Sequence, residues 1–261
     1  KTAKSHPVTM CIHNREVSIK IRTLLIRFFA FSLSLGSSSL LAGDPTLEAN
    51  YNYDLSKFVA WMEASTREKK IPGVALAIVS REGIMHMQTW GVKSIETREP
   101  VHTDSVFRIA SMSKTFAGTS AALLVDQHYQ TWDTKLTDLF PSMHLGTRRS
   151  SGAITLKHVV SHSTGLMPHS YSNLLDDGVG YDRIKSSFSK IPTVCQPGDC
   201  YGYQNVVFSL IGDVVEQSTG ESYEKFIYEQ IFKPLGMITA SVGMEPYLEN
   251  AEATAPHRQS R

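Results

Sequence analysis

The stretch FRIASMSKTF, residues 107–116, decides the fold because an extended or turning approach runs into the start of a helix. Ser111 stands at the beginning of that helix, and Lys114 follows one turn later. Residues three apart share a helix face, so both side chains are expected to point the same way. Backbone N–H groups without helical partners surround such a hydroxyl and favour negative charge. We therefore expect a reactive site at this helix start.

Ser111 and Lys114 are the residue types that acyl-transfer chemistry needs. A serine hydroxyl becomes a strong nucleophile when an adjacent group takes its proton, and the amine of Lys114 is expected to lie within reach. The Ser-x-x-Lys arrangement occurs in enzymes that attack strained or D-configured amides. The free N–H groups at the helix start could also stabilise an oxyanion.

The Ser-x-x-Lys pattern occurs twice more in the chain, at Ser187–Lys190 and at Ser222–Lys225. Ser222 follows a glycine and precedes an apolar-periodic run, which predicts a helix N-cap. Ser187 lies in a serine-rich stretch just before Pro192. We expect these two serines to be structural, so the choice of Ser111 depends on its surroundings.

The composition is that of a globular protein. The chain has 261 residues with 41% hydrophobic content, enough for one large domain or for two lobes that share a core. The net charge is +1, and no long basic run follows residue 30, which argues against a nucleic-acid partner.

Residues 1–42 are predicted to be a signal peptide, and residues 1–9, which precede the first methionine, to be upstream translated sequence. Basic residues at 20, 22 and 27 come before a run of apolar and small residues at 28–41, and Leu40-Leu41-Ala42 offers a cleavage site. This pattern favours an export signal over an uncleaved anchor helix, because the run is short and rich in serine. We expect a periplasmic or secreted protein with no stable membrane span after cleavage.

Cys195 and Cys200 bracket the turn sequence Gln-Pro-Gly-Asp. In an exported protein this spacing favours a local disulfide that fixes the turn. The alternative is half of a zinc site, but the chain has no second cysteine pair. The third cysteine, Cys11, falls in the predicted leader.

The periodicity predicts a helix, a hairpin, the helix that starts at Ser111, and then a mostly helical region. The expected helices span 54–70, 111–127, 205–217 and 222–232, with strands at 74–79 and 84–90 and a short helix capped by Thr155 that runs to Val160. This order predicts an α+β fold, with a sheet lobe and a helical lobe on either side of a cleft.

Tyr203 and Asn205 follow the cysteine-bracketed turn and are separated by one residue, so an extended segment would point both to one side. A phenol near an ammonium has a lowered pKa and can shuttle a proton. An asparagine can hydrogen-bond both a lysine and a substrate amide. Taken singly, Tyr203 is more typical of a half-buried tyrosine beside a turn, and Asn205 of a helix N-cap.

Four segments together resemble a known family: FRIASMSK at 107–114, SHSTGL at 161–166, Pro-Gly followed by Tyr-Gln-Asn at 197–205, and IFKPLGM at 231–237. In this order they are similar to the class C β-lactamase and penicillin-binding-protein-like serine hydrolases. The resemblance covers roughly residues 58–244.

The resemblance implies a β-lactamase/transpeptidase-like α+β fold for residues 43–261. An antiparallel sheet flanked by helices would occupy about 50–125 and 222–261, and an all-helical lobe about 126–221. The family pattern continues with a Lys or His, a Thr or Ser, and a Gly on a later strand, and nothing after Tyr203 matches it. We therefore expect a chain that is truncated before the C-terminal strands and helix.

The resemblance also implies roles for the residues. Ser111 would be the acylated nucleophile, and Lys114 would lower its barrier. Tyr203 would protonate the leaving nitrogen or take the proton of Ser111 or of the deacylating water, and Asn205 would position Lys114 and the substrate amide. The implied substrate is a small-molecule or peptidoglycan-derived amide or ester, and no cofactor is implied.

Other chemistries fit less well. His158 and His162 have the i, i+4 spacing of zinc ligands, but the glutamate of H-E-x-x-H and a third ligand are missing, so we expect no metal. The absence of Gly-x-Ser-x-Gly argues against an α/β-hydrolase. Open alternatives are hydrolysis of β-lactams, of D-alanyl peptides or of carboxylesters, and a non-catalytic binding or remnant protein.

Overall fold

The computed structural model describes residues 45–258, which fall into two compact units. One unit is Val106–Ala253; the described part of the other comprises residues 45–105 and 254–258. The predicted signal peptide lies outside the described residues. Within the described part of the chain, no helix has the length and apolar character needed to cross a bilayer.

The N-terminal unit contains one helix and a hairpin. Helix α1 (Pro45–Glu68) starts earlier than the predicted residue 54, with a proline in the first turn, where proline is favoured. Strands β1 (Gly73–Ser80) and β2 (Gly83–Gly91) pair antiparallel, which confirms the predicted hairpin. The register of the pair is irregular between Ile78 and Val79. A Cβ on Gly91, at φ +78°, would lie 2.0 Å from the carbonyl oxygen of Pro72, so this strand end requires glycine.

The C-terminal segment of the chain packs on this same unit. Ala255 donates a backbone hydrogen bond of 2.9 Å to the carbonyl of Lys93, and the N–H of Ile95 donates to Nε2 of His257 at 3.0 Å. The ammonium of Lys93 forms a 2.9 Å ion pair with Glu99. The two hydrogen bonds join residues 254–258 to the loop that follows β2, and the ion pair lies within that loop.

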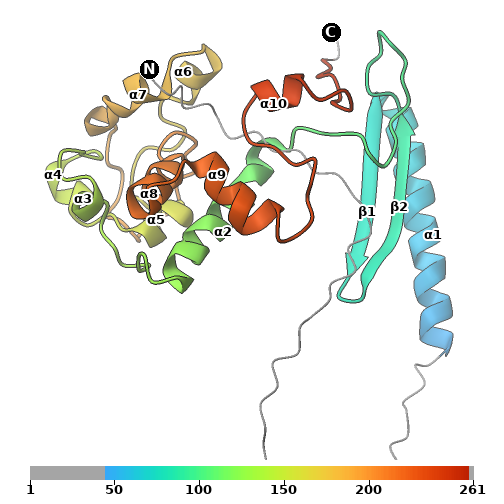
Figure 1. The fold of residues 1–261 in the computed structure, drawn as a ribbon, viewed down its shortest axis with the longest axis horizontal. Helices are drawn as coiled ribbons and strands as arrows, with labels where there is room; N and C mark the ends of the chain where they lie inside the picture. Colours follow the sequence, from blue (N-terminus) through green and yellow to red (C-terminus); the bar gives the residue numbers. More distant parts are fainter. Residues whose placement is uncertain (1–44, 259–261) are drawn as a thin grey trace, which may run out of the picture. The chain divides into compact units, whose positions relative to one another are not determined.

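The regular elements described in the second unit are helices, which turns and loops connect (Figure 1). Its elements are η1 (Ala110–Met112), α2 (Ser113–Asp126), α3 (Leu136–Leu139), α4 (Arg148–Ser151), α5 (Leu156–Val160), α6 (Ser172–Asp176), α7 (Tyr181–Lys185), η2 (Phe188–Lys190), α8 (Leu210–Thr219), α9 (Tyr223–Ile227), η3 (Tyr228–Phe232) and α10 (Glu245–Leu248). Helices α2, α5, α8 and α9 gather around one core, as Figure 1 shows.

Helix α2 lies at the centre of this core because its apolar residues recur at helical spacing. Ala117, Ala121 and Leu124 are buried on one face. They pack in the same cluster as the buried face of α8, which is formed by Leu210, Ile211, Val214 and Val215. The helix that begins beside Ser111 is therefore held by packing along its length.

Several helix ends agree with the sequence. Thr155 is the N-cap of α5, and Gly220, at φ +74°, ends α8 in the left-handed conformation. The hydroxyl of Ser222 accepts a hydrogen bond from the N–H of Lys225 and caps α9, which confirms its structural role. Ser187 occupies the residue before η2.

The predicted bounds of a further helix also differ from the structure. The helix expected at 205–217 starts only at Leu210 and ends at Thr219, because Asn205 uses its side chain for contacts outside the helix and residues 206–209 form turns. The division of the described residues into two compact units follows from how the helices pack. Helices α2 and α9 bury their side chains in the same core as α8, so the unit boundaries fall at 105/106 and 253/254.

Candidate active site

Ser111 lies in a short 3₁₀ turn directly before α2, and its side chain is exposed. Ala110 precedes it at φ +45°, in the left-handed region. Such a backbone at a non-glycine residue costs on the order of 1–3 kcal/mol and is concentrated at functional sites. Lys114 lies in the first turn of α2 and is half-buried. The local fold thus presents an accessible serine hydroxyl beside a partly shielded ammonium group.

Tyr203 reaches this hydroxyl from a distant part of the chain. Its Oη donates a hydrogen bond of 2.8 Å to Oγ of Ser111. Burial of the ring raises the pKa of the Tyr203 phenol, but hydrogen bonds to Lys114 and Ser111 and the charge of Lys114 outweigh that effect. The pKa of Tyr203 is therefore lowered from its usual value, which favours proton exchange between the two hydroxyls.

Asn205 anchors the ammonium of Lys114. Lys114 Nζ donates to Asn205 Oδ1 at 2.9 Å, and Asn205 Nδ2 donates to Ser172 Oγ at 3.2 Å. The second bond fixes the orientation of the amide, so that its oxygen faces the lysine. Lys114 Nζ also lies 4.9 Å from the centroid of the Tyr203 ring and 5.5 Å from that of Phe208. The ammonium is thus held between an amide oxygen and two aromatic faces.

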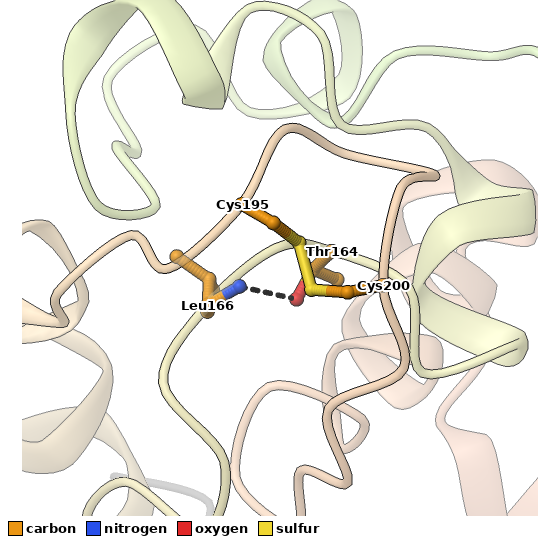
Figure 2. Close-up of a disulfide and its surroundings, with 4 residues drawn as sticks. All are labelled: Thr164, Leu166, Cys195 and Cys200. Carbon is orange, nitrogen blue, oxygen red and sulfur yellow. Dashed lines mark hydrogen bonds between the residues drawn. A yellow bond between two sulfur atoms is a disulfide. The ribbon is translucent and has the colours of Figure 1, made fainter.

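A disulfide joins Cys195 and Cys200, whose Cα atoms are 6.3 Å apart (Figure 2). Figure 2 shows Thr164 and Leu166 beside it, with the N–H of Leu166 donating to the hydroxyl of Thr164 at 3.4 Å. Gly165 is at φ +78°, and a Cβ there would lie 2.4 Å from the carbonyl oxygen of Cys195. The loop 161–166 and the disulfide loop are therefore in close backbone contact just before Tyr203.

His158 and His162 have partners other than a metal. Nδ1 of His158 accepts from the N–H of Thr155 at 3.1 Å and completes the cap of α5. Nδ1 of His162 accepts from the N–H of Gln204 at 3.2 Å. Across residues 45–258, no cluster of three or more His, Cys, Asp or Glu side chains is placed to hold a metal ion.

The structure brings together all four residues that the sequence singled out: Ser111, Lys114, Tyr203 and Asn205. Sequence reasoning missed Ser172, which orients Asn205, and it considered His162 only as a metal ligand. The resemblance contained a hint for His162, since SHSTGL is one of its four segments. Ser172 had no comparable signal.

Residues 58–261 match the family model described as Beta-lactamase. Penicillin-binding protein 4 of Amycolatopsis lactamdurans is 28% identical over 188 residues, which cover 71% of this chain and 48% of that protein. Esterase EstB of Burkholderia gladioli is 27% identical over 218 residues, 74% of this chain and 53% of that protein. The chain spans about half the length of the curated relatives it matches.

A solved structure, the octameric penicillin-binding protein homologue from Pyrococcus abyssi, is similar at a TM-score of 0.68 and 23% identity. The match covers 77% of this chain and 47% of that one and confirms the predicted β-lactamase/transpeptidase-like fold. Members of the matched family include serine hydrolases named as β-lactamases, esterases, D-aminopeptidases and penicillin-binding proteins. The match to the family model covers most of the sequence, and the chain therefore belongs to the β-lactamase family.

Proposed function

We propose that this protein is a serine hydrolase that forms an acyl-enzyme at Ser111. The observation that supports this most directly is the 2.8 Å hydrogen bond between the Tyr203 hydroxyl and Ser111 Oγ, beside the Lys114 ammonium. A nucleophile, a proton-transfer partner and a cation that stabilises the partner's anionic form are thus within direct reach of one another. Ser222 instead caps α9, and Ser187 is the residue before η2.

In this proposal Tyr203, as phenolate stabilised by Lys114, takes the proton of Ser111 while Oγ attacks the substrate carbonyl carbon. The backbone N–H of Ser111 would donate to the oxyanion that forms. When the carbonyl C–N bond breaks, Tyr203 returns the proton to the leaving nitrogen. Water then attacks the ester of Ser111 while Tyr203 takes its proton. When the ester C–O bond breaks, Tyr203 returns that proton to Ser111 Oγ and the acid product leaves. Asn205 keeps Lys114 beside the phenol throughout.

The substrates we propose are β-lactams or D-alanyl peptide amides. Similarity to Penicillin-binding protein 4 supports this class, as does the Ser-x-x-Lys pair itself. Carboxylester hydrolysis is the second candidate, supported by the 27% identity to Esterase EstB. Both classes share the acyl-enzyme and differ in the leaving group. We place the reaction outside the cytoplasm, because the predicted export signal and the Cys195–Cys200 disulfide both favour an oxidising compartment.

Incubation of the folded chain with a fluorescent penicillin tests the acyl-enzyme. The expected result is one covalent label per chain on the peptide that carries Ser111, and none in Ser111→Ala. Ser187→Ala serves as the matched control, because it removes a hydroxyl from the same Ser-x-x-Lys pattern and should keep the label. A folded sample that takes no label and turns over neither amide nor ester substrates would favour a non-catalytic binding protein. Turnover of nitrocefin, of a D-alanyl-D-alanine peptide and of p-nitrophenyl butyrate then separates the substrate classes.

A further inference from the structure

We propose that His162 is a positioning residue that holds the phenol of Tyr203 against Ser111, and that it does so as a neutral ring whose Nδ1 accepts a hydrogen bond. This inference rests on the proposed acylation at Ser111, where Tyr203 transfers the proton. His162 touches neither Ser111 nor, in this proposal, the substrate, so its effect on the reaction passes through Tyr203.

His162 accepts hydrogen bonds from the backbone on both sides of Tyr203. Its carbonyl oxygen accepts from the N–H of Gly202 at 2.7 Å, and its Nδ1 accepts from the N–H of Gln204 at 3.2 Å. The residue between these two bonds is Tyr203. One histidine therefore fixes the direction of the chain into and out of the tyrosine.

The ring of His162 also supports the phenol directly. Its centroid lies 4.6 Å from that of Tyr203 with an interplanar angle of 35°, and 4.9 Å from that of Phe208 at 31°. The imidazole is thus packed between the catalytic tyrosine and a buried phenylalanine. Aromatic pairs of this kind contribute beyond the area that they bury.

The protonation state of the ring matters for both contacts. Nδ1 can accept from Gln204 only when it carries no proton, so the neutral ring carries its proton on Nε2. The titratable groups that face the ring are Lys114 from α2 and Tyr201 and Tyr203 from the segment that follows the disulfide. Burial and the positive charge of Lys114 both lower the pKa of His162. A proton on the ring would place a second cation beside the Lys114 ammonium, and the two charges would repel each other.

Substitutions at His162 can separate the hydrogen bond that Nδ1 accepts from the contact that the ring makes with Tyr203. The residue is at φ +55°, a region that asparagine tolerates better than most residues. His162→Asn places an amide oxygen close to the position of Nδ1 and removes the ring. His162→Phe keeps a ring but has no acceptor for Gln204. His162→Ala removes both.

The first measurement is independent of any substrate. With ¹³Cζ-labelled tyrosine, NMR follows the titration of the Tyr203 phenol. The signal of Tyr203 is assigned as the one that is missing from the spectrum of Tyr203→Phe. In the wild-type chain Tyr203 should titrate below the ordinary tyrosine value of about 10. In His162→Ala it should return toward that value, because a displaced phenol loses Lys114, and His162→Asn should lie between the two. A role in folding alone would not move this titration in a folded variant.

The second measurement is the rate constant of labelling by the fluorescent penicillin. His162→Asn should lower it about twofold to tenfold, the value of one aromatic pair, and His162→Ala about tenfold to 100-fold. The concentration for half-saturation should change less than the rate, since His162 does not bind the substrate. His128→Asn is the matched control: His128 is an exposed histidine at φ +62° after α2, and its variant should behave as wild type.

An unchanged Tyr203 titration together with labelling within twofold of wild type in folded His162→Ala would overturn the proposal. If His162→Ala does not fold by circular dichroism, His162→Phe and His162→Asn make the same comparison, each lacking one contact. A wild-type chain that takes no label while the Tyr203 titration still responds to His162 would refute the proposed function and leave the positioning role supported.

Discussion

The hydroxyl of Tyr203 donates a 2.8 Å hydrogen bond to Ser111 Oγ across 92 positions of the chain. Ser111 is positioned by the buried body of α2, and Tyr203 by the loop that carries the Cys195–Cys200 disulfide. The contact is therefore set by tertiary packing on both sides. This hydrogen bond joins the candidate nucleophile to its proposed proton-transfer partner. The ring of that partner also lies beside the Lys114 ammonium.

Tyr203→Phe should lower the rate of acylation at Ser111 about 100-fold to 10,000-fold, the usual contribution of a positioned general acid–base. The fold should persist, because phenylalanine keeps the ring contact with His162. Stopped-flow labelling with a fluorescent penicillin measures the rate. Tyr129→Phe removes a hydroxyl from an exposed tyrosine outside the site and should leave the rate unchanged. A rate within threefold of wild type in Tyr203→Phe would rule out the proton-transfer role.

Asn205→Leu should lower acylation more than Ser172→Ala does. Leucine removes the acceptor of Lys114 and leaves the ammonium unpaired on that side, whereas Ser172→Ala removes only the bond that orients the amide. Because Ser172→Ala removes a single hydrogen bond, its acylation rate should fall about tenfold or less. The labelling rates of the two variants and of the double variant give the coupling between the residues. Equal losses in the two single variants would contradict this order.

Removal of the Cys195–Cys200 disulfide should lower the free energy of unfolding by about 2 kcal/mol, the value that chain entropy gives for so short a loop. The double variant Cys195→Ser/Cys200→Ser, compared with wild type in urea at equal pH, measures the loss. Reduction of wild type by dithiothreitol should reproduce it, and the reductant should leave the double variant unaffected. An unchanged midpoint after complete reduction would show that the disulfide does not stabilise the fold.

Acidification below about pH 6.5 should destabilise the protein through its histidines. Burial is the main cause that lowers the pKa of His158 and of His162 from the usual 6.5. The unfolded chain therefore takes up protons first as the pH falls, which favours unfolding. This loss starts at the unfolded value and continues until the lowered folded pKa is passed. Urea midpoints between pH 7.5 and pH 5.5 should fall, and less steeply in His162→Asn. A midpoint that is constant or rises on acidification would contradict the assignment.

Local signals in the sequence predicted much of the fold. The hairpin followed from two apolar strands on either side of a short turn, and the Ser222 cap from a serine after a glycine and before an apolar run. Ser111 and Lys114 could be singled out from the sequence because their spacing on one helix is a local property. These elements depend on neighbours within a few residues, which a pattern records directly.

Features that depend on contacts between distant residues were not predicted by the sequence patterns. The start of α8 was placed too early because Asn205, by sequence alone, resembles an N-cap, whereas its side chain binds Lys114 and Ser172. The support of Tyr203 by His162 joins residues 41 apart and has no periodicity. The core that α2 and α9 share with α8 is likewise set by packing, which a helix-period pattern does not specify.

The most direct test of the central claim is the site of covalent modification after incubation with a fluorescent penicillin. Intact-mass spectrometry followed by peptide mapping should show one adduct, on the peptide that carries Ser111, and no adduct in Ser111→Ala. Ser187→Ala and Ser222→Ala should keep the adduct, although the loss of the α9 cap costs Ser222→Ala about 0.5–2 kcal/mol of stability. An adduct that persists in folded Ser111→Ala, or that disappears in folded Ser187→Ala or Ser222→Ala, would contradict the account.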